Sequence, residues 1–163
     1  GVRRDCYGYW ASWLFKPYGA MVVGHRKHKN RWPHSAGANF NGLIFAIWGL
    51  AFNPGTDDIR EAPSLAVIQE LIAAGARILA HDSVVMETMR SSINSEWIVD
   101  QAVVFEANQY DVLSKAGGLI LATEWKPFWN QDSERIITLL NTPVISDGRN
   151  QYDPLKMEIL GIE

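Results

Sequence analysis

The sequence contains a single cysteine, Cys6, among its 163 residues. One cysteine excludes an internal disulfide and a zinc cluster built from several cysteines, and it fits a reducing cytoplasm. No apolar run approaches the roughly 20 residues that a membrane-spanning helix needs. The N-terminus also lacks a signal-peptide pattern, because tryptophan, tyrosine, lysine and glycine interrupt its apolar runs. These absences predict a cytoplasmic globular protein without a membrane partner.

Known nucleotide-binding and catalytic motifs are missing as well. The sequence has neither a G-x-G-x-x-G fingerprint nor a Walker loop, and Gly49 and Gly55 do not have the fingerprint's spacing. No histidine or acidic residue stands in a recognisable relation to Cys6, so a nucleophilic role for this thiol is not expected. The residues alone therefore identify no catalytic group.

Charge is unevenly distributed along the chain. The formal net charge of −3 implies neither a nucleic-acid-binding protein nor a membrane-surface protein. Residues 1–35, however, carry seven Lys/Arg and one acid, whereas residues 36–163 carry eight Lys/Arg and seventeen acids. This asymmetry predicts an N-terminal basic and aromatic arm at 1–40, or a remnant of a connecting helix, ahead of one domain at 41–163.

The arm contains a basic run from His25 to Trp32. A solvated arm that docks through its aromatic residues is the favoured interpretation, and a phosphate or nucleic-acid patch is the alternative. His25, His28 and His34 have ligand-forming side chains, but no nearby cysteine or carboxylate completes a tetrahedral zinc site. We therefore expect neither a metal site nor a nucleic-acid partner.

The clearest pattern of secondary structure is strand, helix, strand. Leu43 to Phe52 is apolar almost throughout, which is typical of a strand buried on both faces of a parallel sheet. A helix is expected from Pro63, with an apolar stripe at 3/4 spacing, and Gly75 suits its C-terminal cap. Arg77–His81 then forms a second short strand.

The remainder of the chain continues this alternation. We expect helices at 84–89, 110–115, 131–141 and 155–160, and strands at 118–122 and 143–146, while 102–105 fits either a strand or the end of a helix. The predicted fold class is therefore α/β: an open sheet of four or five mostly parallel strands with helices on both faces.

Polar clusters follow three of these strands: Asn53–Arg60, Thr123–Trp125 and Asp147–Asn150. The carboxyl ends of parallel strands meet at one edge of a sheet, where open α/β folds bind their ligands. The pattern predicts a ligand cleft along that edge.

Two arginines make this cleft suitable for an anion. Arg60 lies just ahead of the helix at Pro63, and Arg149 follows the last strand. Together with the free N–H groups of a helix start, they suit a phosphate or pyrophosphate. The alternative is that both brace loops, Arg60 through Asp57, Asp58 or Glu61 and Arg149 through Asp147.

Three further residues of the clusters admit two roles each. Asp57 and Asp58 are expected to cap backbone N–H groups of their loop, because adjacent side chains point apart and cannot act as one general base. Trp125 is expected in the core, with stacking on a base ring as the alternative.

From about Asn41 onward the sequence resembles the C-terminal UDP-binding domain of the UDP-glucose/GDP-mannose dehydrogenase family. The resemblance rests on G-L-A-F-N-P-G-T-D-D-I-R-E-A-P-S (Gly49–Ser64), T-E-W (Thr123–Trp125) and D-G-R-N (Asp147–Asn150), in the family's order. It covers roughly three-quarters of the chain. The last two motifs are more similar to the UDP-glucose branch than to the GDP-mannose or UDP-N-acetylmannosamine branches.

The resemblance implies a three-layer Rossmann-like domain of an enzyme that oxidises C6 of UDP-glucose twice, to UDP-glucuronate, with two NAD. The family binds NAD mainly through a separate N-terminal Rossmann domain. Its nucleophilic cysteine lies in G-G-x-C-F-P-K-D and its catalytic lysine in the N-terminal portion; neither appears here, and R-D-C-Y-G-Y-W around Cys6 does not match. The chain alone is therefore expected to be inactive.

The same resemblance assigns binding residues. Phe52 and Arg149 match residues that contact the UDP-sugar, and Arg60 matches the arginine that reaches NAD across the interdomain cleft. The family usually has a substrate-contacting lysine where this chain has Asn53. Asparagine keeps a donor but loses a cation, so we expect substrate binding to be weaker by about 1–2 kcal/mol.

The expected partners are UDP-glucose or UDP-glucuronate, with either a second copy of the chain as a homodimer or a complementary NAD-binding domain. The alternatives to an enzyme's substrate domain are a non-catalytic nucleotide-binding or assembly module and a degenerate remnant.

Overall fold

The computed structural model describes residues 40–60, 62–149 and 151–162. The predicted arm at 1–40 therefore lies almost entirely outside the described residues. The same holds for the roles considered for Cys6, His25, His28, His34, Glu61 and Asn150.

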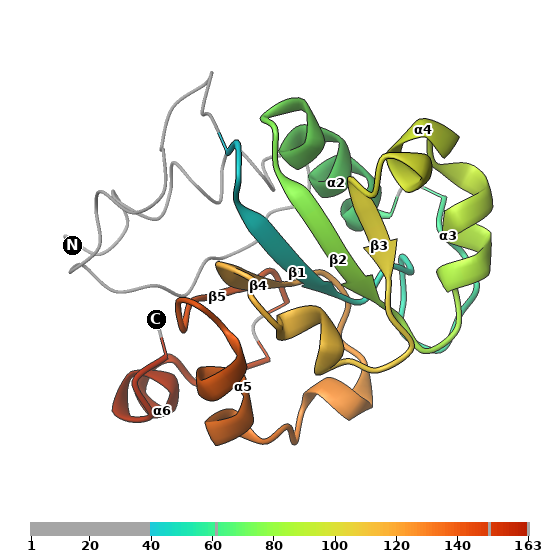
Figure 1. Ribbon diagram of the computed structural model, residues 1–163. Coiled ribbons are helices and arrows are strands. Elements are labelled where there is room, and N and C mark those ends of the chain that lie inside the picture. Colours follow the sequence, from blue (N-terminus) through green and yellow to red (C-terminus); the bar gives the residue numbers. More distant parts are fainter. Residues whose placement is uncertain (1–39, 61, 150, 163) are drawn as a thin grey trace, which may run out of the picture.

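Five strands form one parallel sheet in the order β3-β2-β1-β4-β5 (Figure 1). The strands are β1 (Ile44–Trp48), β2 (Arg77–His81), β3 (Val103–Phe105), β4 (Gly118–Leu121) and β5 (Ile145–Asp147). All four pairings are parallel. The chain moves from β1 outward to β3, then returns to place β4 on the other side of β1. The carboxyl ends of β1 and β4 therefore lie side by side at the point where the strand order reverses.

Helices cover both faces of the sheet, as Figure 1 shows. One face carries α2 (Pro63–Ala73), α3 (Met86–Ser92) and α4 (Ser95–Val99); the other carries α5 (Ser133–Leu139), α6 (Pro154–Ile159) and the short 3₁₀ turns η2 (Asp111–Leu113) and η3 (Lys126–Phe128). This arrangement confirms the predicted α/β class with helices on both faces.

Strand β1 supplies side chains to both apolar cores. Phe45 and Ile47 are buried in the core beneath α2 and α3, whereas Ala46 and Trp48 are buried in the core beneath α5. The Trp48 ring stacks on Phe128 with centroids 5.0 Å apart, and its Nε1 donates to the carbonyl of Gln109 at 2.7 Å. Alternation of this kind explains why the strand is apolar at every position.

The predicted strand at 43–52 is too long at its carboxyl end, because β1 stops at Trp48. Gly49 adopts φ +85°, which turns the backbone out of the sheet, although its N–H still donates to the carbonyl of His81 at 2.9 Å. Leu50 and Ala51 are fully buried in the loop that follows. They are apolar because this loop is buried, and they do not extend the strand.

Several other boundaries also differ from the prediction. Helix α3 starts later than expected and is followed by α4, which was not predicted. Asn94, a residue that weakens a helix interior, instead caps α4 by accepting the N–H of Glu96 at 3.0 Å. Helix α5 is shorter than expected because Asp132 caps it, accepting the N–H of Arg135 at 3.1 Å. Strand β5 begins later, at Ile145, and 103–105 is a strand.

Helix α2 and strand β2 agree with the prediction. Helix α2 begins at Pro63 and ends before Gly75, which takes φ +91° as a C-terminal cap requires. Gln69 and Glu70 are exposed, as expected for its outer face.

Gly49 should tolerate substitution poorly. A Cβ at this position would lie 2.5 Å from Cβ of Thr123 and 2.8 Å from its backbone nitrogen, whereas a Cβ on Gly55, at φ +77°, would meet nothing within 4 Å. Both alanine variants carry the cost of a left-handed backbone, but only Gly49→Ala adds overpacking. We expect urea unfolding to show a loss of about 2–4 kcal/mol for Gly49→Ala and about 1 kcal/mol for Gly55→Ala. Equal losses would contradict this account of the contact with Thr123.

Candidate functional site

Asp82, the residue directly after β2, joins three loops at the carboxyl edge of the sheet. Its side chain is fully buried. One carboxylate oxygen accepts the N–H groups of Leu50 at 2.8 Å and Ala51 at 3.4 Å, and the indole N–H of Trp125 at 3.1 Å. The other oxygen accepts the N–H groups of the loop's own residues 84 and 85, at 2.8 and 3.1 Å. The loops after β1, β2 and β4 are therefore fixed to one carboxylate.

The carbonyl groups of Leu50 and Ala51 are also bonded. The buried hydroxyl of Ser64 donates to the Leu50 carbonyl, and that of Thr123 donates to the Ala51 carbonyl, each at 2.6 Å. The two residues are thus held from both sides, by Asp82 through their N–H groups and by two hydroxyls through their oxygens. Phe52 emerges from this fixed segment with its side chain 38% exposed.

Arg149 joins the loops that follow β1, β4 and β5. Its Nη2 donates to the carbonyl of Phe52 at 3.3 Å, and its guanidinium forms an ion pair with Glu124. Phe52 follows β1, Glu124 follows β4 and Arg149 follows β5. The loops after β1, β4 and β5 therefore meet at the carboxyl edge, whereas the ligand cleft expected there stays a prediction.

Arg149 does brace loops, as the alternative interpretation proposed, but its acidic partner is Glu124 and not Asp147. Asp147 does not pair with the guanidinium: one carboxylate oxygen accepts the backbone N–H of Arg149 at 2.9 Å and the other accepts that of Tyr152 at 2.9 Å. Asp147 thus shapes the turn after β5, and Glu124 neutralises the guanidinium.

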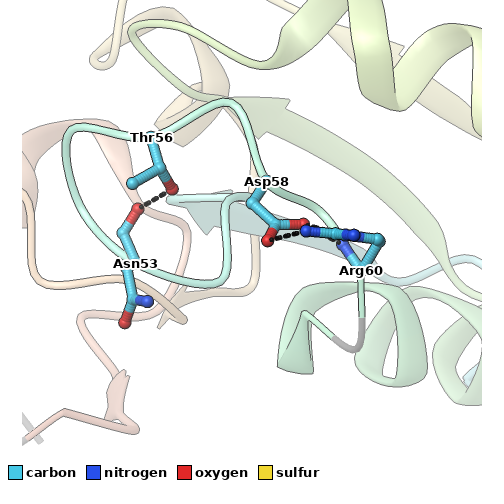
Figure 2. Close-up of polar contacts among 4 residues, drawn as sticks. All are labelled: Asn53, Thr56, Asp58 and Arg60. Atoms are coloured by element: carbon cyan, nitrogen blue, oxygen red, sulfur yellow. Dashed lines mark hydrogen bonds and ion pairs between the residues drawn. The ribbon is translucent and has the colours of Figure 1, made fainter.

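Arg60 is paired with Asp58 in the loop before α2 (Figure 2). The Asp58 carboxylate accepts from Nε, Nη2 and the backbone N–H of Arg60, each at 3.0 Å. The side-chain bond and then the backbone bond lower the pKa of Asp58 to about 2, and the same pair raises the pKa of Arg60. Asp58 therefore caps a backbone N–H as predicted, and stays ionised as pH falls until it approaches about 2.

Asn53 lies in the same loop with an exposed side chain. Its carbonyl accepts the hydroxyl of Thr56 at 2.9 Å. Figure 2 shows that its amide points away from Thr56 and from the Asp58–Arg60 pair. The amide is therefore exposed and faces away from the polar contacts of its own loop.

The start of α2 contributes less to anion binding than expected. Pro63 has no N–H, Pro63 and Ser64 are buried, and the N–H of Leu65 already donates to the carbonyl of Ala62 at 3.1 Å. The expected anion site at this edge therefore depends on the side chains of Arg60 and Arg149.

For Trp125, the sequence left two roles open, packing in the core or stacking on a base ring. It packs against the apolar core beneath α5 and bonds to Asp82 through its indole N–H. The core interpretation is thus the one observed. The role of Asp82 was missed by sequence reasoning, although a charged residue directly after a predicted buried strand was a usable indication.

Within residues 40–60, 62–149 and 151–162, no group of three or more His, Cys, Asp or Glu side chains is arranged to hold a metal ion. None of the helices in that part of the chain is both long and apolar enough to cross a membrane.

Comparisons with known proteins show which family this domain resembles. Residues 46–154 match the model of the UDP-glucose/GDP-mannose dehydrogenase family, UDP binding domain. The chain is 39% identical to the UDP-glucose 6-dehydrogenase of Pseudomonas aeruginosa over 148 residues, which is 91% of this chain and 29% of that protein. It is 36% identical to the enzyme of the same name from Rhizobium meliloti over 118 residues, 72% of this chain and 25% of that protein.

The fold of this chain is similar to that of a solved dehydrogenase structure. The UDP-glucose dehydrogenase of Pyrobaculum islandicum aligns with 72% of this chain and 24% of that chain, with a TM-score of 0.58 and 28% identity. The α/β sheet is therefore Rossmann-like, and the chain spans less than a third of the length of these relatives.

Proposed function

The chain belongs to the UDP-glucose/GDP-mannose dehydrogenase family, whose UDP binding domain it contains, and on that premise we propose that it binds the nucleotide sugar of an NAD-dependent UDP-glucose 6-dehydrogenase. The ligand is UDP-glucose or its product UDP-glucuronate. The observation that carries the proposal is the meeting of Phe52, Glu124 and Arg149 beside the central strands, at the edge where such sheets bind ligands.

The binding groups divide by chemistry. The exposed ring of Phe52 offers an apolar contact, the amide of Asn53 offers a donor and an acceptor, and Arg149 offers a cation to the diphosphate. Arg60 lies on the far side of the same loop, where we assign it to the pyrophosphate of NAD. NAD itself is bound mainly by the family's other Rossmann domain, so the redox chemistry is proposed for the complete enzyme.

The charge balance of the edge predicts weak binding. Arg149 is paired with Glu124 and Arg60 with Asp58, so each described arginine of the site already has an anionic partner. A diphosphate must therefore share Arg149 with a carboxylate. The lysine that the family usually carries at position 53 would add an unpaired cation, and asparagine does not.

Titration of UDP by calorimetry tests this proposal. The wild-type chain should bind UDP weakly, and Asn53→Lys should tighten binding by about 5- to 30-fold, equivalent to about 1–2 kcal/mol. Asn53→Gln is the matched control, since it lengthens the side chain without adding charge, and it should leave the affinity within about twofold of wild type. Absence of heat at millimolar UDP, in both the wild type and Asn53→Lys, would refute the proposed function.

The activity of the isolated chain gives a second outcome of the same proposal. Supplied with UDP-glucose and NAD, the chain should produce no NADH, because no nucleophilic cysteine motif of the family is present in its sequence. Measurable NADH formation would show that this domain carries chemistry we assign to the complete enzyme.

A degenerate domain without a ligand is the second candidate, and Asn53 together with the two paired arginines favours it. The UDP titration distinguishes this candidate from a domain that binds the nucleotide sugar.

We further propose that residues 1–40 continue into the rest of the enzyme and that 41–163 form the UDP-binding domain. The alignment with the Pseudomonas protein supports this, since it is longer than 41–163 and so extends into the arm.

We propose that this chain lies in the cytoplasm, because its one cysteine fits a reducing compartment. The complete enzyme's product, UDP-glucuronate, would serve polysaccharide biosynthesis, and the enzyme's assembly would be a homodimer or a pairing with the NAD-binding domain.

A further inference from the structure

Asp58 links the two arginines of the site, Arg60 and Arg149, through a series of hydrogen bonds. Its side chain holds Arg60 through three hydrogen bonds, each of 3.0 Å (Figure 2). Its backbone carbonyl accepts the N–H of Phe52 at 2.8 Å. The carbonyl of Phe52 in turn accepts from Arg149 at 3.3 Å. A continuous series of contacts therefore runs from Arg149 through Phe52 and Asp58 to Arg60.

The pairing with Asp58 leaves part of Arg60 available. A guanidinium has five N–H donors, and the side-on pair uses the one on Nε and one on Nη2. Among the residues that the structure describes, none bonds to the two donors on Nη1 or to the second donor on Nη2. These donors form the edge that binds a phosphate in an end-on, two-point contact. The carboxylate and a phosphate can thus bind the same guanidinium at different edges.

Because Arg60 is exposed, its pairing with Asp58 restricts a side chain that would otherwise be free to move. Its side chain is 87% exposed, and an exposed arginine without a partner samples many rotamers that must be given up on binding. Asp58 fixes one orientation in advance, and because Asp58 is also bonded to Phe52, that orientation is set relative to the nucleotide-sugar side of the loop.

We propose that Asp58 is a positioning residue, which presents the free edge of Arg60 to the pyrophosphate of a second ligand while the UDP-sugar occupies the side of Phe52 and Arg149. This inference rests on the proposed function for the location of the UDP-sugar. The second ligand is a pyrophosphate diester, the chemical class of a dinucleotide.

The sign of one mutational effect tests this role. Asp58→Asn removes a negative charge beside Arg60, so simple electrostatics predicts tighter binding of an anion. If Asp58 acts by positioning, the same change should weaken binding, by about 3- to 10-fold, because the two-point charged contact to the guanidinium is lost. Asp57→Asn is the matched control: it removes the same charge from an exposed neighbour and should not weaken binding.

The measurement uses inorganic pyrophosphate as the probe and the side-chain Nε–H NMR signal of Arg60 as the readout, at neutral pH with millimolar UDP present. Arg60→Met assigns the signal and should abolish its response. Weaker pyrophosphate binding in Asp58→Asn with unchanged UDP affinity supports the role. Equal or tighter binding in Asp58→Asn, or no response of the Arg60 signal in the wild type, overturns it.

Failure of the proposed function gives a different result. If UDP does not bind, its own titration shows no heat, whereas the Arg60 signal still reports pyrophosphate independently. Thermal denaturation of Asp58→Asn should match the wild type within a few degrees, since both paired side chains are at the surface.

Discussion

Replacement of Asp82 by alanine should lower the free energy of unfolding by about 3–5 kcal/mol, as measured by urea denaturation. The carboxylate accepts four backbone N–H groups and one indole N–H, and it is fully buried. Alanine would leave these donors without an acceptor in a region that water does not readily reach. Each unsatisfied buried donor is costly, so the total exceeds the loss of an ordinary hydrogen bond.

Two further variants serve as comparisons for the stability loss expected in Asp82→Ala. Asp82→Asn keeps one acceptor oxygen but turns an NH₂ group toward the remaining donors, so it should be destabilised by at least about 2 kcal/mol. Asp57→Ala removes an exposed carboxylate from the neighbouring loop and should change stability by less than about 0.5 kcal/mol. A loss below about 1 kcal/mol for Asp82→Ala would mean that the three loops are held by other contacts.

The second large effect is expected on ligand binding. Arg149→Met should weaken UDP binding by about 10- to 100-fold, because it removes a charged hydrogen-bond donor worth about 1.5–3 kcal/mol. Loss of the guanidinium also leaves Glu124 without its partner, and its negative charge would then repel the diphosphate. Calorimetry with UDP measures the change.

Arg77→Met is the matched control for that experiment. Arg77 is the first residue of β2, at the amino edge of the sheet, where its Nε donates to the carbonyl of Gln101 at 3.2 Å. The variant removes the same charge far from the site and should keep UDP affinity within about twofold of wild type. Similar losses in both variants would mean that overall charge, and not the position of Arg149, governs binding.

Local patterns predicted the fold well where sequence and burial agree. Strand β2 has the expected bounds, and α2 begins at Pro63 and ends before Gly75 because proline and glycine act through backbone geometry that is independent of the rest of the fold. The approach of the loops after β1, β4 and β5 to one another was also predictable, since parallel strands end at one edge.

The errors arise where a loop is buried. Leu50 and Ala51 have the composition of a strand, but their N–H groups bond to Asp82 and not to a neighbouring strand. The acceptor lies about thirty residues away in sequence, so no local pattern contains this information. The same applies to the partner of Arg149, which is Glu124 and not the nearer Asp147.

The short outer strands of the sheet have a consequence for how the chain behaves in concentrated solution. Both β3 and β5 are only three residues long, whereas the interior strands β1 and β2 each have five. A free edge of three residues exposes few unpaired backbone groups, so a strand of another molecule finds little to pair with. Self-association by extension of the sheet at these two described edge strands is therefore disfavoured.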